Sequence, residues 1–193
     1  MTRIIAGEAR GRTIKVPTEG TRPTADRARE GLFSSLAARW GFAGSSVLDL
    51  FAGSGALGLE AASRGAEEIV LVESSADAVK IIRHNMGVVK HPGVRVQEMK
   101  VGTYLGSAPR RHFDLVLADP PYAFDEVDEL IAAIEPVLCD HAMVVIERHV
   151  DSAATAWPAG FEPTSQKLKK RTFGIARMDM AVYTRPGSEE PED

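Results

Sequence analysis

The fold is decided by one glycine-rich stretch, Asp49-Leu-Phe-Ala-Gly53-Ser-Gly55-Ala-Leu-Gly58-Leu-Glu60. An apolar run ending at Phe51 leads into it, and a helix-like segment follows it. Gly53, Gly55 and Gly58 have the G-x-G-x-x-G spacing, which lets a strand turn tightly into a helix whose first amides face a ligand. The stretch therefore predicts a ligand-binding loop at the edge of a parallel sheet.

Short apolar runs alternate with helix-like segments around this loop. The runs predict strands at Val47–Phe51, Ile69–Val72, Val94–Val96, Phe113–Ala118 and Met143–Ile146, and the segments between them predict helices at Leu57–Arg64, Ala76–Val89 and Val127–Leu138. Such alternation is typical of a parallel sheet with helices on both faces. The pattern changes over residues 165–184, where Lys167–Lys169 and Met178–Tyr183 predict two antiparallel strands around Gly174.

The N-terminal residues have a different character. Residues 3–16 predict a short hairpin or extended arm, and a helix is expected from Pro23 because Ala28, Leu32, Leu36 and Trp40 form one apolar stripe. Residues 1–39 hold eight Lys and Arg against four acids, so this arm is about +4 although the whole chain is −4. A basic arm of this kind fits nucleic-acid phosphates or a solvated surface.

Composition excludes several classes of protein. The 193 residues fit one domain, 44% are hydrophobic, and no apolar run reaches membrane-spanning length. The N-terminus lacks a signal pattern and Cys139 is the single cysteine, so we expect a cytoplasmic protein without disulfides. The five histidines have no metal-ligand spacing, and we expect a monomer without metal.

Three carboxylates decide which ligand the loop holds. Asp49 ends the first predicted strand, Glu73 ends the second, 20 positions after Gly53, and Asp119 ends the fourth. An NAD(P)-dependent oxidoreductase would bring a pyrophosphate to this acidic rim, whereas S-adenosylmethionine brings an ammonium and a sulfonium. Like charges near 4 Å cost about 1–4 kcal/mol, which favours the cationic cofactor.

The tetrapeptide Asp119-Pro120-Pro121-Tyr122 predicts the chemistry. An exocyclic amine on a base is a poor nucleophile, because its lone pair is delocalised into the ring. The Asp119 carboxylate and the Pro120 carbonyl can bind its two N–H groups, and Tyr122 can stack on the base. Cys139 lies far from both motifs, which disfavours cysteine-dependent carbon methylation. We therefore expect an amino-methyltransferase whose catalytic residues are Asp119 to Tyr122.

These motifs, with the segment Arg22-Pro-Thr-Ala-Asp-Arg-Ala-Arg-Glu-Gly-Leu-Phe33 and the opening Arg3-Ile-Ile-Ala-Gly, resemble the RsmD family of bacterial 16S ribosomal RNA guanine-N2 methyltransferases. The resemblance spans roughly residues 2–185. It implies a Rossmann-like class I methyltransferase fold with a seven-stranded, mostly parallel α/β sheet, an antiparallel C-terminal hairpin and a small N-terminal extension. It also implies methylation of one guanine in the assembled small ribosomal subunit.

The resemblance completes the expected site and organisation. The cofactor would contact Asp49, Ala52, Gly53, Ser54, Gly55, Gly58, Glu73, Ser74, Lys100, Val101 and Asp119, and RNA would contact Arg10, Arg12, Arg22, Arg27 and Arg29. Lys100 departs from the family, which often places Asp or Asn there to bind the adenine, and a protonated lysine accepts no hydrogen bond. We expect a basic hairpin and helix over residues 1–40, a methyltransferase domain over 41–186 and a disordered acidic tail over 187–193.

Three alternatives stay open at this point. They are an NAD(P)-dependent oxidoreductase, an amino-methyltransferase acting on DNA adenine or cytosine, and a non-catalytic binding module with the same fold. The tetrapeptide has no use in the oxidoreductase, and 193 residues leave little room for a separate DNA-reading domain.

Overall fold

The computed structural model describes residues 1–17, 23–165, 167 and 171–187, with the side chains of 23–25 left out. Along the chain the elements are β1 (Thr2–Arg3), β2 (Thr13–Ile14), α1 (Pro23–Arg39), β3 (Ser46–Leu50), α2 (Ala56–Ser63), β4 (Glu68–Glu73), α3 (Ala76–Val89), β5 (Val94–Glu98), α4 (Val101–Ser107), β6 (Phe113–Ala118), α5 (Val127–Ile134), the 3-10 helix η1 (Glu135–Val137), β7 (Leu138–His149), β8 (Phe161–Pro163), β9 (Thr172–Phe173) and β10 (Ala176–Tyr183).

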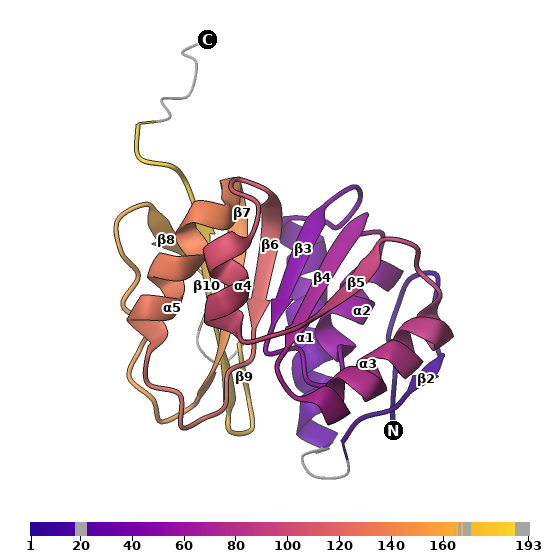
Figure 1. Ribbon diagram of the computed structural model, residues 1–193. Helices are drawn as coiled ribbons and strands as arrows, with labels where there is room; N and C mark the ends of the chain where they lie inside the picture. The colour runs from indigo at the N-terminus through magenta and orange to yellow at the C-terminus, as the bar shows by residue number, and fades with distance from the viewer. Residues whose placement is uncertain (18–22, 166, 168–170, 188–193) are drawn as a thin grey trace.

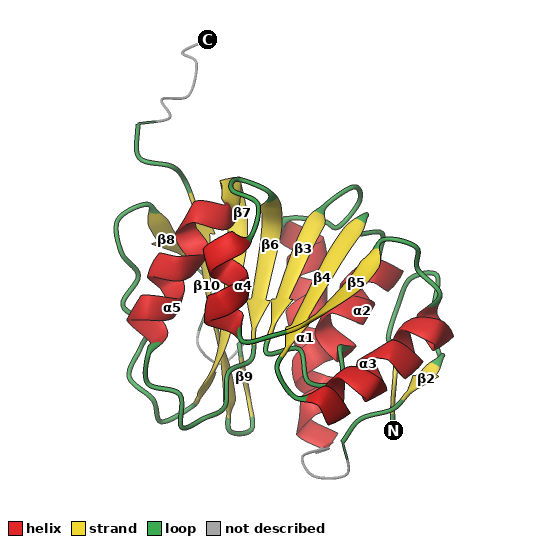
Figure 2. Ribbon diagram, in the orientation of Figure 1, coloured by secondary structure: helices red, strands yellow, loops and turns green. Residues whose placement is uncertain are grey.

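The main sheet lies between two layers of helices (Figures 1 and 2). Its strand order is β5-β4-β3-β6-β7-β10-β8, and β9 pairs with β10 outside this path. Strands β5, β4, β3, β6 and β7 are parallel, whereas β10 runs antiparallel to β7, β8 and β9. The predicted mostly parallel sheet with an antiparallel C-terminal hairpin is therefore confirmed, with β9 as an eighth strand beside the seven that were expected.

The period-two pattern of the strands divides the core between the two faces. Val47 and Leu115 pack with α1, α2 and α3 in one buried cluster, whereas their neighbours Leu48 and Val116 pack with α4 and α5 in the other. Both faces are thus covered, as the continuous apolar runs predicted. The sequence order reverses between β3 and β6, and in an open parallel sheet the carboxyl ends of the strands at such a switch point form a ligand crevice.

The N-terminal arm forms the expected hairpin and is fixed to the helical layer. Strands β1 and β2 pair antiparallel, with Thr2 opposite Ile14. The fully buried carboxylate of Glu60 on α2 accepts hydrogen bonds from the amides of Ile5 (2.8 Å) and Ala6 (3.1 Å), and from Nε of Arg64 (2.8 Å). Because these donors satisfy a buried charge, they hold the arm firmly on α2.

A second contact joins the arm to the glycine loop. The buried Asn85 side chain on α3 accepts from the Lys15 amide (2.8 Å) and donates to the carbonyls of Lys15 (2.7 Å) and Ser54 (2.9 Å). One amide group therefore connects the chain that leads out of the hairpin with the loop that follows β3.

Several predicted boundaries were wrong, each for a local reason. The helix expected over Val127–Leu138 ends at Ile134, because Pro136 has no N–H to continue it. Strand β7 extends to Leu138–His149 through a β-bulge near His141, whose φ is +61°. Helix α4 and strand β8 were not expected. Leu168 and Lys169 of the predicted strand lie outside the described residues, Lys167 belongs to no strand, and β9 pairs with β10 instead.

Candidate active site

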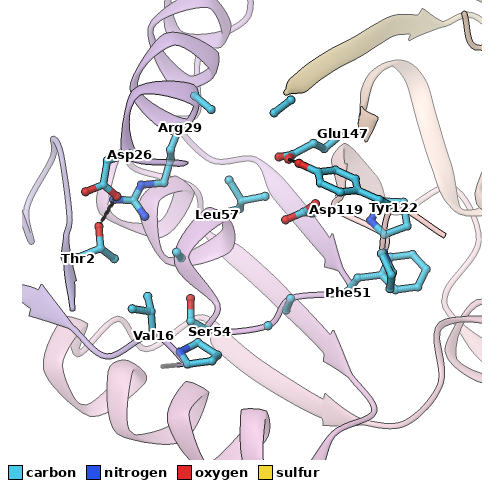
Figure 3. Close-up of a pocket in the computed structure, with 18 of the residues that line it drawn as sticks. Thr2, Val16, Asp26, Arg29, Phe51, Ser54, Leu57, Asp119, Tyr122 and Glu147 are labelled. Atoms are coloured by element: carbon cyan, nitrogen blue, oxygen red, sulfur yellow. Dashed lines mark hydrogen bonds and ion pairs between the residues drawn. The ribbon is translucent and has the colours of Figure 1, made fainter. Parts of the chain in front are cut away.

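A cavity of about 930 Å³ opens at the carboxyl edge of the sheet. The loops after β3, β4 and β6 form one side of it, and the arm, α1 and the β9–β10 hairpin form the other. Figure 3 shows Asp119, Tyr122 and Glu147 together on one wall, with Thr2, Asp26 and Arg29 across the cavity. All four residues of the tetrapeptide line this space.

The glycine loop supplies the floor of the cavity, and its conformation explains the glycine spacing. Gly53 and Gly55 have φ values of +56° and +77°, in the left-handed region that side chains other than glycine rarely adopt. Gly58 sits in α2 where a Cβ would lie 2.2 Å from Cδ2 of Leu71. The first two glycines therefore make the turn, and the third lets the helix pack against β4.

The predicted cofactor residues separate into three groups by position. Ala52, Gly53, Ser54, Glu73, Ser74 and Asp119 line the cavity. Asp49, Gly55 and Gly58 are buried beneath the loop and do not line it, although Gly58 still packs the helix. Lys100 and Val101 lie outside the lining. Lys100 is exposed just before α4, an element that the sequence analysis missed.

Glu73 fixes the loop from the end of β4. Its Oε2 accepts from the Gly53 amide at 2.9 Å, and its Oε1 accepts from the Ser75 amide at 2.8 Å. The half-buried carboxylate thus borders the cavity in a fixed orientation. Carboxylate oxygens accept more than one hydrogen bond, so Glu73 keeps capacity for hydroxyl donors of a ligand.

We expected the Asp49 carboxylate to lie at the mouth of the glycine loop, but it does not. Its side chain is fully buried, Oδ2 accepts from the Gly58 amide at 2.8 Å, and Oδ1 has no hydrogen-bond partner among the described residues. Burial, and then the charges of Asp119 and Glu73, raise the pKa of Asp49 to about 7. Asp49 therefore supports the loop from below rather than adding a charge to the rim.

Glu147 takes the place of Asp49 among the acids that face the cavity. It lies on β7 beside the tetrapeptide, and the Tyr122 hydroxyl donates to its Oε1 at 3.4 Å. Desolvation raises the pKa of Asp119 to about 6, and burial followed by the charge of Asp119 raises the pKa of Glu147 to about 7. The acidic rim inferred from the sequence therefore exists, but it consists of Glu73, Asp119 and Glu147.

Tyr122 presents an aromatic face at the cavity mouth. Its side chain is 49% exposed, and its ring meets the His149 ring edge-on, with centroids 5.2 Å apart. The exposed ring surface and its fixed edge suit stacking on a planar ligand.

The arginines expected to contact RNA occupy different environments. Arg10 and Arg27 are exposed, and Arg22 lies outside the described residues. Arg12 is also exposed, but its Nη1 donates to the carbonyls of Val88 (2.9 Å) and Val89 (2.7 Å) at the end of α3. Arg10 and Arg12 lie on the arm and Arg27 lies on α1, and none of these three lines the cavity.

Arg29 is different, because it is buried. Its Nη2 donates to Oγ1 of Thr2 (2.8 Å) and to the carbonyl of Arg3 (2.7 Å), and it lies 3.3 Å from Asp26. The guanidinium therefore joins α1 to β1 and borders the cavity, a position that does not favour contact with an RNA backbone outside it.

Glu147 is the residue beside the tetrapeptide that sequence reasoning missed. No local motif marks it, since Val144 to Ile146 is read as an ordinary buried strand. The available signal was an acid directly after an apolar parallel strand, the same signal that identified Asp119.

The described residues show neither a metal site nor a membrane-spanning helix. They contain no group of three His, Cys, Asp or Glu side chains placed to hold a metal ion. None of their helices combines the length and the apolar character needed to span a bilayer.

Comparison with known proteins gives consistent matches along most of the chain. A family model described as Conserved hypothetical protein 95 matches residues 2–181. Ribosomal RNA small subunit methyltransferase D of Escherichia coli (strain K12) is 36% identical over 169 residues, which cover 86% of this chain and 84% of that protein.

Solved structures of methyltransferases also match most of this chain. The Escherichia coli protein yhhF, described as a candidate methyltransferase, superimposes with a TM-score of 0.82 at 32% identity, covering 95% of this chain and 98% of the other. A candidate SAM-dependent methyltransferase from Streptococcus mutans has a TM-score of 0.63 at 16% identity, covering 84% of this chain and 49% of the other, and shares the fold.

Proposed function

The chain belongs to the family of ribosomal RNA small subunit methyltransferase D, and from this premise we propose that it transfers a methyl group from S-adenosylmethionine to the exocyclic N2 of a guanine in 16S ribosomal RNA. The single observation that carries the proposal is the cavity, which places the Asp119–Tyr122 tetrapeptide beside the glycine loop. One space thus joins a candidate cofactor subsite to a candidate base subsite. We propose the assembled small subunit as the substrate, as the family resemblance implies.

The glycine-loop side of the cavity fits S-adenosylmethionine. Ala52, Gly53 and Ser54 expose backbone to the cavity, and Glu73 offers acceptor oxygens for ribose hydroxyls. Glu73 and Asp119 give this side a negative character that complements an ammonium and a sulfonium. The Streptococcus mutans neighbour, described as SAM-dependent, supports the same cofactor. Bound there, S-adenosylmethionine would supply an electrophilic methyl group.

The tetrapeptide would prepare the amino group of the base. We propose that the Asp119 carboxylate and the Pro120 carbonyl accept its two N–H bonds and direct the nitrogen lone pair toward the methyl group. Tyr122 would hold the base by stacking, since a base must leave its helix to reach a recessed site. As the N–C bond forms and sulfur keeps the electrons of the S–C bond, Asp119 accepts the proton that the nitrogen releases.

The arm would bind the RNA backbone. We propose Arg10, Arg12 and Arg27 as phosphate contacts, because their side chains are exposed and lie on the arm and α1, two elements that form one side of the cavity. We leave Arg29 out of this set because its guanidinium is already engaged within the protein. Each phosphate contact would add about one unit to the slope of log affinity against log salt.

The proposal is tested by supplying labelled S-adenosylmethionine with naked 16S ribosomal RNA, small ribosomal subunits and duplex DNA in parallel. Label in N2-methylguanine from RNA or subunits supports it, and the more active of these two shows which is the substrate. Label confined to adenine or cytosine of DNA, or no transfer to any of the three, would overturn it.

The tetrapeptide is tested by Asp119→Ala. This variant is expected to lose transfer while binding S-adenosylmethionine within about tenfold of the wild-type affinity, because the change removes an interaction made with the reacting group. Asp125→Ala, which alters an exposed acid further along the same loop, is the matched control and should transfer normally. Normal transfer by Asp119→Ala would remove the role assigned to this carboxylate.

A further inference from the structure

Glu147 and Asp119 are neighbours because of the register between two strands. In the parallel pair β6–β7, Leu117 lies opposite Val145 and Ala118 lies opposite Ile146. Asp119 and Glu147 are the next residues on the two strands, so both carboxylates emerge at the same edge of the sheet. Figure 3 shows them side by side, with the Tyr122 hydroxyl against Glu147.

If the Glu147 carboxylate only stabilised the fold, we would expect a cation to be paired with it. None of the ion pairs among the described residues includes Glu147, whereas the buried Glu60 and Asp179 are each paired with an arginine. Glu147 is partly buried beside another acid, and this position raises its pKa to about 7. Two adjacent acceptors without a cation, both lining the same cavity, fit a ligand that brings adjacent hydrogen-bond donors.

Among the bases with an exocyclic amino group, only guanine offers such donors in adjacent positions. Its N2 amino group lies beside the N1–H donor. The N6 amino group of adenine lies beside N1, and the N4 amino group of cytosine lies beside N3, and both of these ring nitrogens are acceptors. A second carboxylate next to the amino-binding acceptors would attract guanine and repel the lone pairs of the other two bases.

We infer that Glu147 reads the base, accepting a hydrogen bond from N1–H of the target guanine while Asp119 and Pro120 hold its amino group. This inference rests on the proposed methyl transfer and deepens it, because it assigns the choice of base to a named side chain. Glu147 is thus a specificity-determining residue, and the Tyr122 hydroxyl orients its carboxylate.

The first test uses the wild-type protein and compares two bases that share the 2-amino group. After the methylated position has been mapped, RNA is prepared by ligation with either guanine or 2-aminopurine at that position. 2-Aminopurine keeps the 2-amino group but has an acceptor lone pair at N1 and lacks O6. At about pH 8.5, where Asp119 and Glu147 are ionised, we expect transfer to 2-aminopurine to be at least about tenfold slower. Equal rates would overturn the inference.

The second test reverses the preference. Glu147→Gln replaces one acceptor by an amide that can donate to N1 of 2-aminopurine. We expect transfer to guanine to fall by about 10- to 100-fold, which is the usual effect of losing a hydrogen bond to a charged group. The ratio of 2-aminopurine to guanine transfer should rise at least about tenfold. A merely structural role would lower both rates together and leave this ratio unchanged, which would overturn the inference.

Glu135→Gln is the matched control. Glu135 also accepts a hydrogen bond from a tyrosine hydroxyl, that of Tyr183 at 3.3 Å, but it does not line the cavity. The ratio of 2-aminopurine to guanine transfer by Glu135→Gln should equal that of the wild type. If Glu147→Gln fails to fold, equal rates of the wild type on the two bases would still overturn the inference. Absence of transfer to guanine by the wild type would refute the proposed function itself, whereas transfer without discrimination would refute the role of Glu147 alone.

Discussion

Replacing Asp49 by asparagine is expected to stabilise the protein at alkaline pH. Asp49 is fully buried, and burial raises its pKa from 3.8 to about 7. Between these two values the folded protein keeps a proton that the unfolded chain has lost, so the free energy of unfolding falls as the pH rises. The contribution is highest below about pH 4 and is lost once the pH passes about 7.

The size of the effect follows from the difference between the two values. At about 1.4 kcal/mol for each pKa unit, ionised Asp49 lowers the free energy of unfolding by at most about 4 kcal/mol. Asparagine keeps an acceptor for the Gly58 amide but places an N–H group where Oδ1 has no partner, which costs about 1–3 kcal/mol. We therefore expect Asp49→Asn to be more stable than the wild type by about 1–3 kcal/mol at about pH 8.5.

Urea unfolding at about pH 5 and about pH 8.5 checks this expectation. The stability difference between Asp49→Asn and the wild type should grow by about 2–3 kcal/mol between the two pH values. Titrations of Asp119 and Glu147 occur in both proteins and largely cancel in the difference. Asp125→Asn, at an exposed position, should give no such change. A difference that is independent of pH, or a variant less stable than the wild type at about pH 8.5, would refute the reasoning.

Two further predictions concern the arm and the acid pair. Glu60→Ala should lower the free energy of unfolding in urea by about 3–5 kcal/mol, because it leaves the partly buried Arg64 guanidinium and two amides without this acceptor, whereas the exposed neighbour Glu67→Ala should change it little. A loss below about 1 kcal/mol for Glu60→Ala would show that the arm does not depend on this carboxylate. The kcat/KM for methyl transfer should rise with pH through about 6 and 7 and then level off, since Asp119 and Glu147 must lose their protons to accept hydrogen bonds. A profile that is flat from about pH 5.5 to 8 at constant ionic strength would contradict this dependence.

The sequence predicted what depends on local pattern. The glycine spacing at Gly53, Gly55 and Gly58 requires a tight strand-to-helix turn, and the structure has that turn. Asp119 could be placed at the sheet edge because it follows an uninterrupted apolar strand. Both features are encoded within a few residues, so no knowledge of the tertiary structure was needed.

The features of the site that the sequence did not predict depend on contacts between residues far apart in the chain. Glu147 also follows an apolar run, but its position beside Asp119 is set by the register of β6 and β7, which neither strand reveals by itself. Arg29 has the sequence context of an exposed helical arginine, yet the hairpin covers it. Asp49 ends a strand as Asp119 does, but its side chain turns beneath the loop to cap the Gly58 amide. An acidic residue at the end of a strand is thus predicted to lie near the site, but the sequence does not say in which direction its side chain points.

The attachment of the arm has a consequence for the order in which the protein folds. The partners of the arm are far along the chain, since Glu60 follows Ala6 by 54 positions and Asn85 follows Lys15 by 70. The arm leaves the ribosome before α2 and α3 during synthesis, so it must wait until these helices have been made and packed on the sheet. The part of the cavity wall that the arm forms is thus made before the helices that hold it, and it is completed after them.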